Sequence, residues 1–100
     1  MKIIDRVDLA GIQPEIIIAV IICNDVLNSY GEEMTITSCK DGEHIRSSKH
    51  YIGHAIDIRT IDIPDDTLMY IYDEIKRKLS IQYDVILGEN HIHIEYDKKK

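Results

Sequence analysis

The sequence predicts an α+β domain in which helices cover one face of a small antiparallel sheet. The chain has 100 residues, which is enough for a single domain, 1–100. Two stretches carry the end signals of helices, and four shorter stretches have the β-branched content or the alternation of strands. Their order along the chain is a helix, two strands, a second helix and two more strands. This order favours an antiparallel sheet with its helices packed on one side.

The first helix is expected from Pro14 to Tyr30. Proline suits the first turn of a helix, and Gly31 suits the position just past its end. The apolar stripe of this helix consists of Ile16, Val20, Cys23, Leu27 and Tyr30. Other isoleucines widen the stripe, so we expect the helix to be covered on more than one side. These are Ile17, Ile18, Ile21 and Ile22.

The second helix is expected from Pro64 to Leu79. Two acidic residues follow Pro64 in its first turn, and three basic residues lie in its last turn, so both ends complement the helix dipole. Its inner stripe consists of Leu68, Ile71, Ile75 and Leu79.

Four strands are expected from β-branched content and from alternation of apolar with polar residues. They are Met34–Thr37, His54–Arg59, Gln82–Leu87 and His91–Tyr96. The polar stretch from Cys39 to Tyr51 is expected to form a loop. A tight turn at Gly88, Glu89 and Asn90 joins the last two strands.

Composition disfavours two classes of function. The 12 basic and 18 acidic residues give a net charge of −6, whereas a nucleic-acid binder normally has a basic surface. The chain contains six tyrosines but no Trp or Phe, which makes an aromatic platform for stacking bases a poor expectation. The longest apolar run, from Ile16 to Cys23, is far shorter than the ~20 residues that span a bilayer. We therefore expect no membrane insertion.

The N-terminal stretch does not resemble a signal peptide, because Asp5 and Asp8 interrupt it before any long apolar segment. We therefore expect a cytoplasmic protein as synthesised. The two cysteines, Cys23 and Cys39, form no disulfide framework, and free thiols fit a reducing compartment. Cys23 lies in an apolar run and is expected to be buried, whereas the sequence leaves open whether the two cysteines meet.

The five histidines lie in two groups, residues 41–57 and 89–95. In the second group a strand would place His91, His93 and Glu95 on one face and the neighbouring isoleucines on the other. Burial of those isoleucines turns both imidazoles to the opposite side. This arrangement suits a site lined by ligands, although a polar solvent-facing strand has the same pattern.

In the first group, a turn at Gly53 would let His50 approach Asp57. Two neutral imidazoles and one carboxylate are the ligands of a catalytic zinc site with a vacant coordination position, whereas closed structural sites are usually rich in cysteine. One negative charge against a dication leaves the site positive, which favours ionisation of bound water.

Residues 48–57, SKHYIGHAID, match the pattern SxHxxGxAxD. This pattern resembles the zinc signature of the D-Ala-D-Ala carboxypeptidase family, which includes D-alanyl-D-alanine dipeptidases and phage L-alanyl-D-glutamate endolysins. The string from Asp41 to Asp57, followed by the HIH of residues 91–93, also resembles the Hedgehog signalling domain, which shares the fold. The resemblance covers roughly residues 34–97 and implies a Hedgehog/D-Ala-D-Ala peptidase-like fold in a compact phage or bacterial form.

The resemblance implies one zinc ion held by His50, Asp57 and His93. It places His44 beside the metal as a supporting or oxyanion-stabilising group, a role that His91 would share. Ser48 would tie down the loop that presents His50. His54 falls at a variable position of the signature and is expected to be a surface or sheet-face histidine.

The same resemblance implies a general base and a partner for the substrate carboxylate. The family places a carboxylate a few residues before the third ligand, which makes Glu89 the candidate base, with Glu95 in reserve. Many relatives would have the acid one position before Glu89, where this chain has Gly88. Arg46 and Arg59 are candidates to hold a substrate carboxylate, and the upstream position of Arg46 agrees with the family; both also suit a surface charge.

The implied activity is that of a zinc metallopeptidase that cleaves peptidoglycan stem peptides, as a carboxypeptidase or an endopeptidase, with zinc-activated water. Its partner would be a peptidoglycan peptide or another D-Ala-containing peptide. It would reach the cell wall after release from the cell or as part of a phage particle. The alternative is a zinc-stabilised binding or structural module with the same fold and no turnover.

Overall fold

The computed structural model describes residues 1–4, 7, 9, 11–39 and 55–97. Residues 41–54 of the first histidine group lie outside this part of the chain. Among them are five residues singled out above: His44, Arg46, Ser48, His50 and His54.

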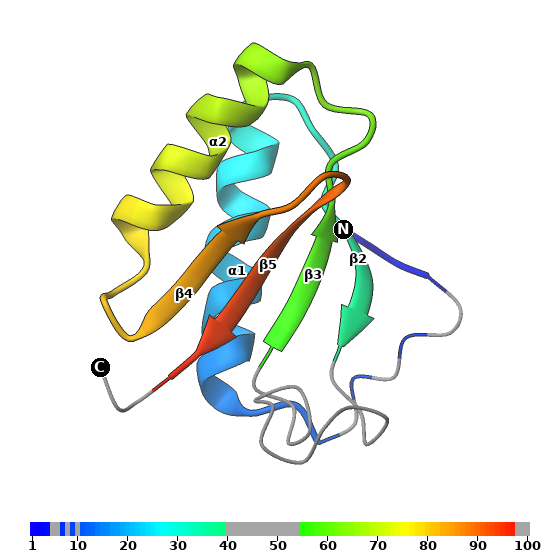
Figure 1. The fold of residues 1–100 in the computed structure, drawn as a ribbon. Coiled ribbons are helices and arrows are strands. Elements are labelled where there is room, and N and C mark those ends of the chain that lie inside the picture. Colours follow the sequence, from blue (N-terminus) through cyan, green and yellow to red (C-terminus); the bar gives the residue numbers. More distant parts are fainter. Residues whose placement is uncertain (5–6, 8, 10, 40–54, 98–100) are drawn as a thin grey trace.

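The described residues form a small α+β domain with two helices and one five-stranded sheet (Figure 1). The helices are α1 (Pro14–Ser29) and α2 (Asp65–Lys78). The strands are β1 (Lys2–Ile3), β2 (Thr35–Cys39), β3 (Ala55–Arg59), β4 (Tyr83–Leu87) and β5 (His91–Tyr96). The order across the sheet is β1-β2-β3-β5-β4. The predicted α+β class is confirmed.

The prediction of a wholly antiparallel sheet was wrong, because β1 adds a parallel edge. Lys2 and Ile3 pair in parallel with Thr35 and Ile36 of β2, whereas the other three strand pairs are antiparallel. A strand of two exposed residues shows no alternation, so hydrophobic periodicity gives no signal for it. The sheet is therefore mixed.

The second correction concerns the end of β2, which extends to Cys39 rather than stopping at Thr37. The pairing with β3 shifts between Ile36 and Ser38, so the bulged strand continues past the point where simple alternation ends. Cys39, expected in the loop, instead lies opposite Ile56 and is buried. The shift also places Ser38 opposite Asp57.

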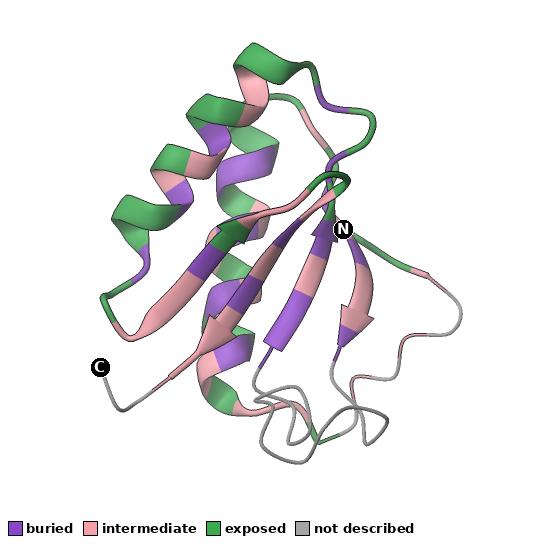
Figure 2. Cartoon of the chain, in the orientation of Figure 1, coloured by how far each residue is buried: buried purple, intermediate pink, exposed green. Residues whose placement is uncertain are grey.

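The hydrophobic core lies between the two helices and one face of the sheet (Figure 2). Alternate residues of the two central strands are fully buried on this face: Ile56 and Ile58 of β3, and Ile92 and Ile94 of β5. The helices contribute their inner stripes, including Ile16, Cys23, Leu27, Ile71 and Ile75. Packing on a single face leaves the other face of the sheet for polar residues.

The expectation that α1 is covered on more than one side was wrong for three isoleucines. Ile17, Ile18 and Ile21 are about half exposed, and only the stripe toward the sheet and α2 is buried. Cys23 lies on that stripe and is a free, fully buried thiol, and burial raises its pKa to about 12. Among the described helices, none is long and apolar enough to cross a membrane.

Truncation of a central isoleucine tests this one-sided core. We expect Ile94→Ala to lower the free energy of unfolding by about 2–5 kcal/mol, because it removes a fully buried side chain from β5. Ile86→Ala is the matched control, since Ile86 lies on neighbouring β4 and is 54% exposed; its effect should stay within about 0.5 kcal/mol. Urea denaturation measures both, and equal losses would contradict a core confined to one face.

Candidate metal centre

The open face of the sheet carries the polar residues of β3 and β5 side by side. Asp57 of β3 lies directly opposite His93 of β5 in the antiparallel register. Because side chains alternate along a strand, burial of Ile56 and Ile58, and of Ile92 and Ile94, turns Asp57 and His93 to the same open face. The register therefore brings two sequence-predicted ligands together across 36 positions of chain.

His93 contacts two carboxylates, one through each ring nitrogen. Its Nδ1 lies 2.8 Å from Oδ1 of Asp57, and its Nε2 lies 3.1 Å from Oε1 of Glu95. The three side chains are only partly exposed, at 16% for His93, 22% for Asp57 and 23% for Glu95. Partial burial strengthens charge-assisted hydrogen bonds of this kind.

The two carboxylates favour the protonated imidazole of His93. The hydrogen bond with Asp57 raises the pKa of His93, burial acts against this rise, and the hydrogen bond with Glu95 adds to it. The surroundings of the His93 ring are therefore negative, which favours a positive charge on the ring.

The segment that contains the remaining predicted ligand, His50, joins the sheet at the end where Glu95 lies. Cys39 and Ala55 are the described residues on either side of it, and Ala55 pairs with Glu95. Among the residues that the structure describes, no group of three His, Cys, Asp or Glu side chains converges to hold a metal ion. Asp57 and His93 supply two of the three predicted ligands, and their nitrogen and oxygen donors are those that zinc accepts.

Glu89, the predicted base, lies in the turn between β4 and β5. Gly88 donates its backbone N–H to the carbonyl of His91 at 2.8 Å, which leaves Glu89 and Asn90 as the two turn residues. Glu89 is exposed, and it lies toward the opposite end of β5 from Glu95. Glu89 precedes the start of β5 by two residues, and four residues of fully extended chain would span at most about 13 Å, so the turn decides how near Glu89 comes to His93.

His91 shares the open face with His93, and its ring packs against Gly88. A Cβ atom added at Gly88 would lie 2.8 Å from Cε1 and 3.0 Å from Nε2 of that ring. Any larger residue at position 88 would therefore require the His91 ring to move. An acidic residue at this position could not coexist with the present position of the His91 imidazole.

This contact predicts the effect of a single methyl group. Gly88→Ala should displace the His91 ring, because neither ring atom can stay within 3.0 Å of a Cβ. The measurement is the NMR shift of the His91 ring Cε1–H, which should move while that of His93 stays. Asn90→Ala, in the same turn, is the control and should leave both rings unchanged; an unmoved His91 in Gly88→Ala would contradict the packing.

Arg59, one of the two candidates for a substrate carboxylate, makes an ion pair within its own segment. Its guanidinium lies 3.5 Å from a carboxylate oxygen of Asp62, and both side chains are exposed. Arg59 lies opposite His91, two pairs along the register from the Asp57–His93 pair. It is thus a surface charge near the open face, and Arg46 lies outside the described residues.

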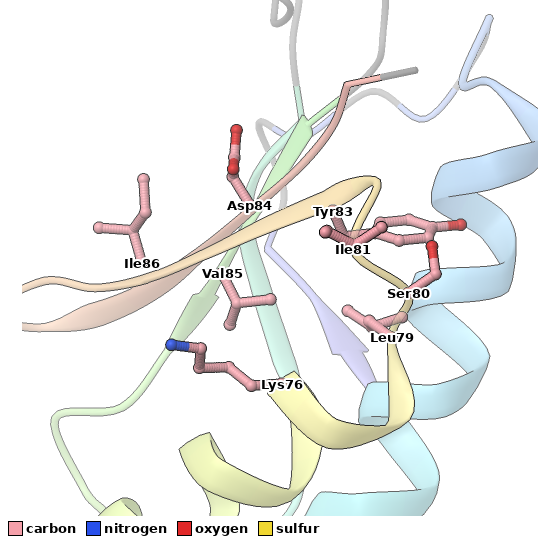
Figure 3. Close-up of a pocket in the computed structure, with 8 residues that line it drawn as sticks. All are labelled: Lys76, Leu79, Ser80, Ile81, Tyr83, Asp84, Val85 and Ile86. Atoms are coloured by element: carbon pink, nitrogen blue, oxygen red, sulfur yellow. The ribbon is translucent and has the colours of Figure 1, made fainter. Parts of the chain in front are cut away.

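A pocket that sequence reasoning did not find lies beside edge strand β4. It has a volume of about 480 Å³, and its lining includes Lys76, Ile81, Tyr83 and Val85. Figure 3 shows Asp84 and Ile86 projecting from the other side of β4, away from Lys76. Its lining does not include Asp57 or His93, so this pocket lies apart from the Asp57–His93 pair.

Comparisons of the chain with protein-family models, with curated proteins and with solved structures found no match.

Proposed function

We propose that the protein is a small zinc metallopeptidase of the Hedgehog/D-Ala-D-Ala peptidase-like fold that cleaves peptidoglycan stem peptides. The observation that carries this proposal is the contact between Asp57 and His93, residues from two separate motifs that the register pairs on one open sheet face. The resemblance of residues 48–57 to the zinc signature supplies His50 as the third ligand. The donor set of one carboxylate and two imidazoles fits a catalytic zinc site.

The residues of this chain would divide the work of hydrolysis among them. Zinc, when bound, supplies Lewis acidity that polarises the scissile carbonyl and lowers the pKa of water, so that water can lose a proton near neutral pH. Glu89 would accept the proton of the attacking water and deliver it to the leaving amine. An imidazole, His44 or His91, would donate a hydrogen bond to the oxygen that gains negative charge. Arg46 would hold a carboxylate of the substrate, and Ser48 would fix the loop of His50.

A non-catalytic zinc-stabilised module is the second candidate, and one observation favours it. Glu89 lies in an exposed turn, and the carboxylate in contact with His93 is that of Glu95, which the signature does not place as the base. A domain with its metal ligands in place and its base displaced would bind zinc without turnover.

Removal of a ligand tests the metal centre. We expect His93→Ala and His50→Ala each to abolish zinc retention, because two ligands hold the ion far more weakly than three. The measurement is zinc per protein by atomic emission after gel filtration. His54→Ala, at a variable position of the signature, should retain the wild-type content. Equal zinc in all three variants would contradict this ligand set.

Incubation of the protein with muropeptides, with and without a zinc chelator, separates the two candidate functions. Cleavage that the chelator stops supports the peptidase. Bound zinc with unchanged substrate, across several peptides and the free D-Ala-D-Ala dipeptide, supports the module.

Within the peptidase, we expect Glu89→Gln to keep zinc and to lose activity by about 10²–10⁴-fold, the usual contribution of a general base. Full activity in Glu89→Gln would exclude Glu89 as the base. The kinetic parameter to measure is kcat/KM on the muropeptide that the wild-type protein cleaves.

A further inference from the structure

The two nitrogens of the His93 ring have different partners, and this difference has a chemical consequence. Nδ1 faces Asp57 across the sheet, and Nε2 faces Glu95 on the same strand. A neutral imidazole carries one proton, and only its other nitrogen can bind a metal ion. The partner of each nitrogen therefore decides which one is available.

Glu95 lies on the same open face of the sheet as His93. The two residues are separated by one position on β5, so alternation places them on the same side. Strand β5 lies between β3 and β4, and Glu95 pairs with Ala55 on one side and Asp84 on the other. The methyl group of Ala55 cannot form a hydrogen bond with the His93 ring. Asp84 places a further acidic residue beside Glu95.

We propose that Glu95 is a positioning residue that holds the Nε2–H of His93, so that Nδ1 is the nitrogen presented, with Asp57, to the metal ion. This inference rests on the proposed function. Histidine ligands of metals generally donate their second N–H to a carboxylate or a carbonyl, which fixes the tautomer and the orientation of the ring. The 2.8 Å contact of Nδ1 with Asp57 marks the side on which both predicted ligands meet. Glu95 lies on the other side of the ring.

The assignment gives Glu95 a role different from that of a base or a ligand. One of its two carboxylate oxygens, Oε1, lies 3.1 Å from Nε2 of His93, and in this arrangement Glu95 acts on the reaction through the position of that ring. The competing arrangement is a metal ion held between Nε2 and Glu95, with Asp57 as the partner of the protonated Nδ1. The two arrangements differ in which ring nitrogen is bound to zinc, and this is measurable.

The first experiment is long-range ¹H–¹⁵N NMR of the uniformly labelled full chain, titrated with zinc. We expect the Nδ1 resonance of His93 to move to the position of a metal-bound nitrogen, while Nε2 keeps its proton. Zinc on Nε2 would overturn the assignment. Failure of the wild-type protein to bind zinc would overturn it together with the proposed function.

The second experiment measures the zinc dissociation constant by competition with a chromophoric chelator. We expect Glu95→Ala to weaken zinc binding by about 10–100-fold, the usual loss when the carboxylate behind a histidine ligand is removed. Glu95→Gln keeps an oxygen acceptor and should lose less. Asp73→Ala removes an exposed carboxylate from α2, on the opposite face of the sheet, and should leave zinc affinity unchanged.

These variants separate failure of this inference from failure of the proposed function. A wild-type protein that binds zinc through Nδ1, with equal affinity in Glu95→Ala, would overturn the positioning role and leave the metal centre standing. Circular dichroism of the metal-free protein shows whether Glu95→Ala folds. If it does not, the zinc affinity of Glu95→Gln and the NMR assignment of the zinc-bound nitrogen still test the positioning role.

Discussion

Burial of Ile92 and Ile94 is the constraint on which the candidate site depends. Both side chains are fully buried against the helices, and a shift of β5 by one residue would expose them and bury the histidines instead. The core thus fixes the register of β5, and the register fixes His93 opposite Asp57. The same alternation on β3 buries Ile56 and Ile58. The position of the polar pair is set by apolar packing on the other side of the sheet.

The features that followed from the sequence are those in which local pattern and tertiary packing agree. Strand β5 was predicted at its observed bounds, because isoleucine and polar residues alternate there without interruption. The helix ends lie within a residue of their predicted positions, since Pro14, Gly31 and the charges of α2 mark them. Side chains alternate between the two faces of a strand, and this alternation alone predicted one shared face for His91, His93 and Glu95.

The errors arose where structure depends on partners distant in sequence. The pairing of Lys2 with Thr35 creates β1, and no pattern within two residues predicts it. The bulge after Ile36 brings Cys39 into the sheet, although the polar residues around it suggested a loop. Isoleucine is usually a core residue, but α1 has its packing partners on one side only. The side chains on its other side are therefore exposed, namely Ile17, Ile18 and Ile21. Sequence patterning identifies apolar faces, whereas the number of neighbours that cover them depends on topology.

Charge balance at His93 bears on whether the centre can be catalytic. Two carboxylates flank one imidazole, so Asp57 and Glu95 together with a zinc dication would sum to zero if both were ligands, and the metal would lose the excess positive charge that acidifies water. If Glu95 instead engages the Nε2–H, only Asp57 neutralises the ion directly. A coordination position then remains for water. In the proposed zinc centre, the hydrogen bond between Glu95 and the far side of the ring would therefore leave the ion with more positive charge than direct ligation by Glu95 would, and the two residues concerned lie two positions apart on a single strand.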